Sequence, residues 1–202
     1  LCAEKGLVIN SSHEDADLIL DHPETVVENL EAFGCRYTAY PFPKGVDFSS
    51  EESIENLIKR LDHSGSVLRE AGKVLTYHNH DHEFQEIGGI PVLELIYSGT
   101  SPENLQGEID TFWVYAGGSS PEAWCARLRD RLPLLHIKDY KEDAEGKREF
   151  AEIGYGVLDF KTIIATAEAS GCEWFIVEQD RCAGDPFESL EKSFRYISDH
   201  LV

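Results

Sequence analysis

Short apolar segments rich in β-branched and aromatic residues recur along the chain and alternate with amphipathic segments. In the amphipathic segments, apolar residues recur at helical spacing, most clearly over residues 54–68 and 187–201. The alternation predicts strands connected by helices, and units of this size imply parallel strands joined by right-handed crossovers. The predicted strands are residues 7–10, 36–40, 74–80, 106–112, 133–139 and 174–179.

Local signals predict where the helices begin and end. Serine, aspartate and proline residues typical of helix N-termini precede the amphipathic segments. Glycines typical of helix C-termini stand a few residues before the next predicted strand. The start signals are Asp21-His22-Pro23, Ser49-Ser50, Ser119-Ser120-Pro121 and Asp185-Pro186, and the stop signals are Gly34, Gly72 and Gly171.

Polar residues gather where strand after strand is predicted to end, and no glycine-rich nucleotide-binding loop follows the first strand. A (β/α)8 barrel needs this distribution, because its active site is assembled from many strand ends at one rim. We therefore predict an α/β fold, a TIM (β/α)8 barrel, with residues 1–202 in a single domain. Such a barrel takes roughly 250 residues. We accordingly expect an N-terminally incomplete barrel, lacking its first one or two β/α units in this chain.

The charge of the chain disfavours two classes of partner. Eighteen basic and 38 acidic side chains give a formal charge of −20, which repels phosphate backbones and anionic lipid. We therefore expect neither a nucleic acid nor a membrane partner, and a homo-oligomer remains open. The five cysteines include no C-x-x-C pair, which indicates a reducing compartment and predicts a cytoplasmic protein.

The segment 77–83, Tyr-His-Asn-His-Asp-His-Glu, is the strongest chemical signal in the sequence. Residues two apart on a strand share a face, so His78 and His80 should point together. Paired imidazoles at a strand end suit a divalent metal or an acid/base pair. The alternative is a solvated turn in which the histidines cap a helix. Three histidines and two acids after an apolar segment favour the functional interpretation.

Three later strands also end in polar residues. Asp110 is either a metal ligand or a turn residue. No helix is expected to begin after it, because a glycine-serine segment, residues 117–120, follows closely. His136 and Lys138 share a strand face and would be costly there without partners, so a metal ligand beside a cationic substrate clamp explains both. The alternative is a strand that ends earlier and leaves a charged loop. Glu178 closes a buried-strand pattern and is placed to bind a metal or to abstract a proton.

In combination, these motifs resemble the sugar phosphate isomerase/epimerase family, which shares the xylose isomerase-like TIM barrel. The similarity extends from residue 6 to the last predicted helix and is specific for the superfamily, without specifying a reaction. The visible strands would be the third to the eighth of the barrel. The motifs that carry the resemblance are residues 75–84 (LTYHNHDHEF), 108–114 (EIDTFWV), 133–140 (PLLHIKDY), 152–159 (EIGYGVLD) and 176–180 (IVEQD).

The resemblance implies one divalent metal held by residues from the last four strands. Asp110, His136 and Glu178 match three of the family's four ligand positions. At the remaining position His78 stands where the ketose 3-epimerases carry glutamate, and this departure puts two-carboxylate epimerisation in doubt. Mixed oxygen and nitrogen ligands suit Mn²⁺, Zn²⁺, Co²⁺ or Mg²⁺.

The implied chemistry is proton abstraction next to a carbonyl of a small sugar or keto-sugar, with an enediolate stabilised by the metal. Glu178 or His80 would take the proton. His13, Glu83, Trp113 and Lys138 would bind and orient the sugar. Inosose dehydratase-like members also carry a His-x-His pair, so a keto-sugar dehydratase or lyase is the rival. A sugar-binding barrel without catalysis is a third alternative. The charge of −20 disfavours the DNA substrate of the related three-zinc endonucleases.

Overall fold

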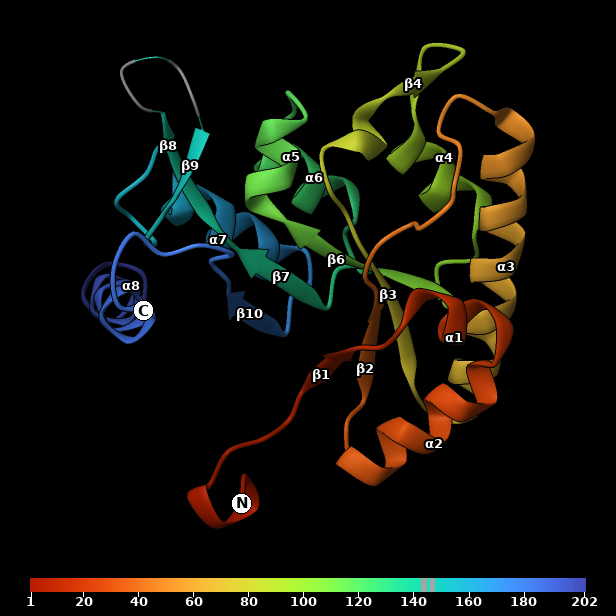
Figure 1. Cartoon of the computed structure of the whole chain (residues 1–202), viewed down its shortest axis with the longest axis horizontal. Helices are drawn as coiled ribbons and strands as arrows, with labels where there is room; N and C mark the ends of the chain where they lie inside the picture. Colours follow the sequence, from red (N-terminus) through yellow and green to blue (C-terminus); the bar gives the residue numbers. More distant parts are fainter. Residues whose placement is uncertain (143–144, 146–147) are drawn as a thin grey trace. The chain divides into compact units, whose positions relative to one another are not determined.

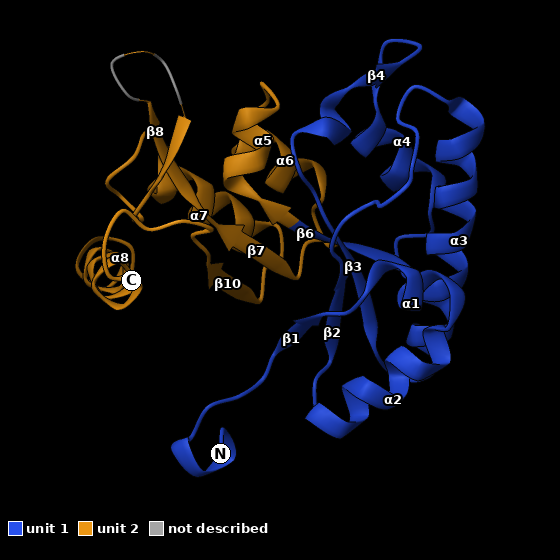
Figure 2. Ribbon diagram, viewed as in Figure 1, with its two compact units in different colours: residues 1–108 blue, residues 109–202 orange. Residues whose placement is uncertain are grey.

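The structure is a computed structural model that describes residues 1–142, 145 and 148–202. The chain divides into two compact units, Leu1–Glu108 and Ile109–Val202, which are coloured separately in Figure 2. The division falls inside strand β6 (Leu105–Asp110), so its first four residues belong to the first unit. Within the described residues no helix is both long and apolar enough to cross a membrane.

The first unit is built on parallel strands that are adjacent in the order β1, β2, β3 and β6. Helix α3 packs against β3 and against its neighbouring helices α2 and α4 (Figure 1). The strands are β1 (Ser11–His13), β2 (Tyr37–Tyr40), β3 (Val74–His78) and the start of β6, and a small antiparallel pair is formed by β4 (Glu86–Ile87) and β5 (Ile90–Pro91). The helices are η1 (Ala3–Lys5), α1 (Ala16–Asp21), α2 (Pro23–Phe33), α3 (Glu51–Glu70), η2 (His82–Phe84) and α4 (Val92–Gly99).

The second unit contains one parallel pair, one hairpin and four helices among its described residues. Helix α6 packs against α7, and α5 packs against β7 and β8. The strands are β7 (Leu134–Ile137) and β10 (Trp174–Val177), which pair in parallel, and β8 (Asp139–Glu142) and β9 (Arg148–Ala151), which form the hairpin. The helices are α5 (Thr111–Ala116), α6 (Pro121–Arg127), α7 (Phe160–Ala169) and α8 (Pro186–His200).

Most of the predicted helix starts are confirmed by capping hydrogen bonds. The side chains of Ser50, Ser120 and Asp185 each accept a hydrogen bond from a backbone N–H in the first turn of α3, α6 and α8. Each bond satisfies one of the N–H groups that a helix start leaves without an intrahelical partner. The Asp21-His22-Pro23 signal is also confirmed, because α2 begins at Pro23. Here the N-cap residue is His22, which makes no side-chain capping bond.

Several sequence predictions were wrong. Strand β3 ends at His78 and β7 ends at Ile137, so His80 and Lys138 lie beyond the strands that were predicted to contain them. The first strand is β1, not residues 7–10, because parallel pairing with β2 begins at Ser11, opposite Tyr37. The apolar Leu7 and Val8 before it are exposed. A helix, α5, does begin directly after Asp110. The Asp110 side chain caps it by accepting a hydrogen bond from the Trp113 backbone N–H at 3.0 Å, so the strand ends at 110 instead of 112.

Candidate active site

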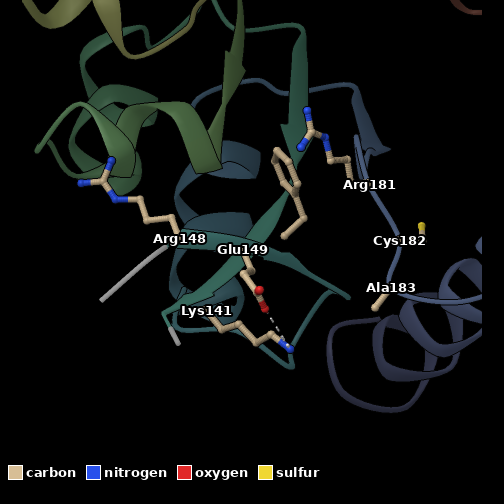
Figure 3. Close-up of a pocket in the computed structure, with 7 residues that line it drawn as sticks. Lys141, Arg148, Glu149, Arg181, Cys182 and Ala183 are labelled. Atoms are coloured by element: carbon tan, nitrogen blue, oxygen red, sulfur yellow. Dashed lines mark ion pairs between the residues drawn. The ribbon is translucent and has the colours of Figure 1, made fainter. Parts of the chain in front are cut away.

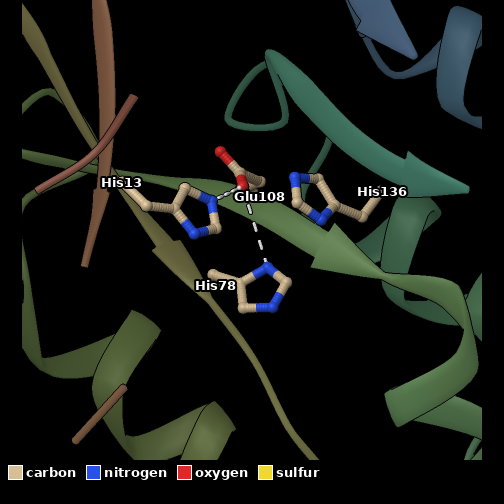
Figure 4. A group of neighbouring side chains, drawn as sticks. All are labelled: His13, His78, Glu108 and His136. Atoms are coloured by element: carbon tan, nitrogen blue, oxygen red, sulfur yellow. Dashed lines mark hydrogen bonds and ion pairs between the residues drawn. The ribbon is translucent and has the colours of Figure 1, made fainter. Parts of the chain in front are cut away.

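In the first unit, strand ends bring two of the predicted residues, His13 and His78, to one carboxylate. His78 and Glu108 are register partners on the adjacent parallel strands β3 and β6. Partners in register project from the same face of a sheet. His13 ends β1, and its Nε2 lies 2.6 Å from Oε1 of Glu108, a direct hydrogen bond. Nδ1 of His78 lies 3.7 Å from the same oxygen, and Figure 4 shows both contacts as dashed lines.

Glu108 is completely buried, and a further partner satisfies its other oxygen. The Thr76 hydroxyl lies 3.3 Å from Oε2 of Glu108 and 3.1 Å from the Thr38 carbonyl. The single hydroxyl hydrogen of Thr76 is therefore shared between these two acceptors, and Oε1 of Glu108 is the oxygen that faces the two imidazoles. Glu108 was not predicted as a site residue. The signal was present, because Glu108 precedes Asp110 by two positions on a predicted strand, and residues two apart share a face.

The His-x-His pair is close in space, for a reason other than strand alternation. Strand β3 ends at His78, so His80 lies beyond it. The ring centroids of His78 and His80 are 5.0 Å apart, and the His80 ring stacks on His82 at 5.4 Å. A turn produces this arrangement, because the His80 backbone N–H donates to Oε2 of Glu83 at 2.8 Å. His80, His82 and Glu83 each place one potential ligand atom within 4.8 Å of the others.

Glu83 is fully buried and its described partners belong to its own unit. Besides the His80 amide, it accepts a hydrogen bond from the Tyr77 hydroxyl at 2.9 Å. Burial raises the pKa of Glu83 to about 7, although these hydrogen bonds favour the ionised form. The predicted role of Glu83 in orienting a sugar stays a prediction. In this structure the carboxylate secures the turn that carries His80.

In the second unit, the remaining predicted ligands gather around Lys138. Asp110, His136 and Glu178 each place one potential ligand atom within 4.8 Å of the others. Nδ1 of His136 is in hydrogen-bonding contact with Oε2 of Glu178. Lys138 is only 1% exposed, and its Nζ lies 3.0 Å from Oδ2 of Asp110 and 3.4 Å from Oε1 of Glu178. Asp180 supplies a third carboxylate at 3.2 Å from Nζ of Lys138, and the sequence did not predict it as a partner.

In this cluster, burial and the neighbouring charges shift the pKa values of Asp110 and Lys138 in opposite directions. Burial raises the pKa of Asp110 to about 6, against the stabilising charges of Lys138 and His136. Burial by itself would lower the pKa of Lys138, but Asp110 and Glu178 outweigh it and raise that pKa. Lys138 is therefore a permanent cation. It faces the same carboxylates that are predicted to bind a metal.

Aromatic rings cover the cation on another side. Nζ of Lys138 lies 5.6 Å from the ring centroid of Trp113 and 5.9 Å from that of Phe150. Both distances permit cation–π attraction. Trp113, which the sequence predicts as a substrate-binding residue, is thus placed beside the predicted cationic clamp. Phe150 was not predicted as a site residue. It lies in strand β9, and nothing in the neighbouring sequence marks it as different from an ordinary apolar strand residue.

Phe150 also lines a pocket of about 240 Å³ within the second unit, drawn in Figure 3. None of the predicted site residues lines this pocket. Lys141 and Glu149 form an ion pair across the β8–β9 hairpin at 3.9 Å, and Arg148 donates to the Ala116 carbonyl. The complete lining is Lys141, Arg148, Glu149, Phe150, Arg181, Cys182 and Ala183.

Asp139 organises the loop that contains the Glu152–Asp159 motif. Its buried carboxylate accepts hydrogen bonds from four backbone N–H groups. Gly156 must approach closely for this, since a Cβ there would lie 2.2 Å from Oδ1 of Asp139. The motif that contributes to the resemblance therefore has a structural explanation in this loop. The donors to Asp139 are the amides of Tyr140, Gly154, Gly156 and Leu158.

Comparisons with known proteins show the family and the fold of this chain. The chain is 28% identical over 167 residues to an inosose dehydratase of Geobacillus thermodenitrificans, a match that covers 74% of this chain and 55% of that protein. The chain thus spans about half the length of this relative. A sugar phosphate isomerase/epimerase from Parabacteroides distasonis has the same fold, with a TM-score of 0.84 at 23% identity over 98% of this chain and 73% of that chain.

A second solved structure with this fold contains a metal. It is a xylose isomerase-like TIM barrel protein from Mycobacterium smegmatis in complex with magnesium, with a TM-score of 0.74 at 16% identity. The match covers 98% of this chain and 74% of that chain. Residues 2–200 of the sequence match the model of one protein family, the xylose isomerase-like TIM barrel. The chain belongs to the xylose isomerase-like TIM barrel family.

Proposed function

We propose that this chain catalyses a metal-dependent reaction in which a proton is abstracted next to the carbonyl of a small sugar or keto-sugar. The observation that carries the proposal is the convergence of Asp110, His136 and Glu178 on one cluster. Two carboxylates and an imidazole form the mixed donor set that suits Mn²⁺, Zn²⁺, Co²⁺ or Mg²⁺. When bound, the ion supplies a Lewis acid that stabilises the negative charge of an enediolate. The assignment of His78 as a fourth ligand stays a prediction from sequence.

Glu178 is the proposed base. Its side chain is 34% exposed, so a substrate can reach it. One oxygen contacts His136 and the other contacts Lys138, and a carboxylate of this kind can accept a proton from carbon while it keeps its position. Lys138 adds a fixed positive charge beside the developing oxyanion. His80 is the second proposed proton carrier, and His13, Trp113 and Glu83 are proposed to bind the sugar.

Isomerisation or epimerisation is the outcome we propose for this chemistry, because the fold matches a sugar phosphate isomerase/epimerase. Dehydration of a keto-sugar is the second candidate, and it begins with the same proton abstraction. The relative named inosose dehydratase favours it. The partner in either case is a small sugar. Location in the cytoplasm and the state of association stay predictions.

A solvent-exchange experiment tests the proposal. The protein is loaded with Mn²⁺ and incubated with a panel of ketoses and keto-sugars in D₂O, and the products are followed by NMR. Deuterium entering a C–H bond without loss of a group indicates isomerisation or epimerisation, whereas loss of water indicates dehydration. If neither occurs with any sugar that binds, the alternative of a sugar-binding barrel without catalysis is correct and the proposal is wrong.

Two substitutions sharpen this test. Glu178→Gln keeps the shape of the side chain and removes its charge, so both exchange and metal content should fall. The control is Glu168→Gln, an exposed residue of α7 in the same unit. His80→Asn should slow exchange by roughly 10²–10⁴-fold with metal content unchanged if His80 carries a proton. Loss of metal together with activity would make His80 a ligand instead.

A further inference from the structure

We propose that the pocket drawn in Figure 3 binds an anionic group, a phosphate or a carboxylate, at one end of the sugar. The pocket is formed by the β8–β9 hairpin and residues 181–183, all within the second unit. This inference rests on the proposed function, because it adds to the sugar a charged substituent that proton abstraction itself does not require. The two proposals make different predictions, so either can fail alone.

Positive charge predominates among the residues that line the pocket. Three of the seven lining residues are basic, Lys141, Arg148 and Arg181, and one, Glu149, is acidic. The chain as a whole has 38 acidic and 18 basic side chains, so the charge balance of this cavity departs strongly from that of the molecule. A local excess of cations in a cleft attracts an anion, although the net charge of the chain is −20.

Arg181 is the cation most available to a ligand. No acidic side chain among the described residues forms an ion pair with its guanidinium group, and Asp180, directly before it, pairs with Lys138 at 3.2 Å. Arginine presents a planar fork of donors that matches the oxygens of a carboxylate or a phosphate. A guanidinium group at the wall of a cavity, with its neighbouring carboxylate already paired elsewhere, is therefore suited to bind an anion.

The other two cations differ in their contacts. Lys141 pairs with Glu149 at 3.9 Å, and the two side chains are 54% and 47% exposed, so this ion pair is weak and can give way to a ligand. Arg148 donates to the Ala116 carbonyl at 2.9 Å, and its side chain extends away from Lys141 in Figure 3. Lys141 and Arg181 are accordingly the two proposed anion ligands, one from the hairpin and one from the segment after β10.

The pocket adjoins the residues that are proposed to carry out the chemistry. Phe150 forms part of its wall, and the centroid of the same ring lies 5.9 Å from Nζ of Lys138. That Nζ lies 3.4 Å from Oε1 of Glu178, the proposed base. Arg181 follows Glu178 by only three positions in the chain. A sugar whose carbonyl lies beside Glu178 can thus extend past Phe150 and place its far end in the pocket.

The volume of the pocket suits one end of a substrate. Pockets that enclose a whole drug-sized ligand have volumes of roughly 300–1,000 Å³. At about 240 Å³ this pocket is smaller, so it accommodates a terminal group instead of a complete sugar derivative. Solvent reaches the pocket, because Arg181 and Ala183 are exposed. A charged group can therefore enter it while the rest of the sugar lies beside Glu178.

Exchange rates with three matched ketoses test this inference. Fructose, its terminal phosphate ester and fructuronate differ only at the carbon farthest from the carbonyl, and each is incubated with the Mn²⁺-loaded protein in D₂O. We expect kcat/KM for deuterium exchange to be about 10–100-fold higher for an anionic ketose than for fructose, the range expected for charge-assisted hydrogen bonds. A preference for the phosphate ester identifies a phosphate ligand, and a preference for fructuronate identifies a carboxylate.

Substitutions identify the pocket as the source of this preference. Arg181→Gln should reduce the ratio of kcat/KM between the anionic ketose and fructose by about 10–100-fold, and Lys141→Gln should reduce it in the same direction. The control is Arg195→Gln, which removes the same charge from an exposed residue of α8 in the same unit and should leave the ratio unchanged. If Arg181→Gln and Arg195→Gln give the same ratio, the inference is wrong.

Calorimetry separates this inference from the proposed function. Binding of the phosphate ester and of fructuronate is measured in the wild-type protein and in both arginine variants. An affinity about 10–100-fold weaker in Arg181→Gln than in Arg195→Gln would support the anion pocket even if no ketose exchanges a proton, so only the proposed reaction would fail. Exchange at equal rates for all three ketoses would overturn the inference and retain the proposed function. Absence of binding by both anionic ketoses would also overturn the inference.

Discussion

Glu108 and Asp110 are two buried carboxylates two residues apart on one strand, yet their partners differ. Glu108 faces the imidazoles of His13 and His78 and the hydroxyl of Thr76. Asp110 faces the ammonium group of Lys138 at 3.0 Å and caps a helix. A partner that can lose its charge leaves the carboxylate dependent on hydrogen bonds, whereas a permanent cation holds it by charge. Two carboxylates that are equally buried are thus stabilised in different ways, Glu108 by hydrogen bonds and Asp110 by a positive charge.

The largest loss of stability is expected when the permanent cation, Lys138, is removed. Lys138→Met leaves Asp110 buried without its cation and removes a shared partner of Glu178 and Asp180. Breaking a buried ion pair from one side costs about 3–5 kcal/mol of unfolding free energy. Urea denaturation of the metal-free protein measures it, with Lys161→Met, an exposed residue of α7, as the control. If Lys138→Met loses no more unfolding free energy than Lys161→Met, Asp110 does not depend on a cation and does not differ from Glu108 in this respect.

An intermediate effect is expected from pH at Glu83, the other buried carboxylate of the first unit. Burial raises its pKa from 4.5 to about 7, so the folded state holds its proton more tightly than the unfolded state. The stability this contributes is fully present below about pH 4.5 and is lost as pH rises through 7, an effect of roughly 3 kcal/mol. Denaturation at pH 5 and pH 8 should show a smaller difference between the two pH values in Glu83→Gln than in the wild type.

The matching control is Glu86→Gln, which replaces an exposed carboxylate near Glu83 and should leave the pH dependence as in the wild type. If Glu83→Gln also leaves the pH dependence unchanged, Glu83 is ionised throughout this range. In that case its hydrogen bonds from Tyr77 and His80 would hold the charge as firmly as a cation does.

The smallest effect concerns Asp139, a carboxylate of the second unit that is held by backbone amides instead of a cation. Gly156→Ala would bring a Cβ to 2.2 Å from Oδ1 of Asp139 and from the Tyr140 carbonyl, so the loop must shift. Crowding of this kind costs about 1–3 kcal/mol, and thermal unfolding should report it. Gly184→Ala is the control, because no atom lies within 4 Å of its added Cβ. Equal melting temperatures for the two variants would show that the loop adapts freely.

Much of the fold could be predicted from the sequence because its signals are local. The strands at residues 37–40, 74–78, 134–137 and 174–177 lie inside the predicted ranges. The capping residues Ser50, Ser120 and Asp185 were identified from side chains that act on their own helix. In each case the interaction spans only a few residues, so the amino-acid pattern contains the necessary information.

The site could be predicted only in part. The sequence identified Asp110, His136, Lys138 and Glu178 individually, because each polar residue follows an apolar strand. It did not reveal Asp180 as a third partner of Lys138, or the hydrogen bond between His13 and Glu108, which are 95 residues apart. Partners at such separations are chosen by strand register and by side-chain rotamers, and neither leaves a local pattern.

The sequence by itself determined the order of strands and helices and the residues at the strand ends, since periodicity and capping are properties of neighbouring residues. Only the tertiary structure decided which partner each buried carboxylate has. The pairing of β3 with β6 sets His78 opposite Glu108, and the helix that begins after Asp110 turns that carboxylate into a cap. The physical reason is that a buried charge is stabilised by whatever donor the fold brings within about 3 Å, and that distance depends on three dimensions.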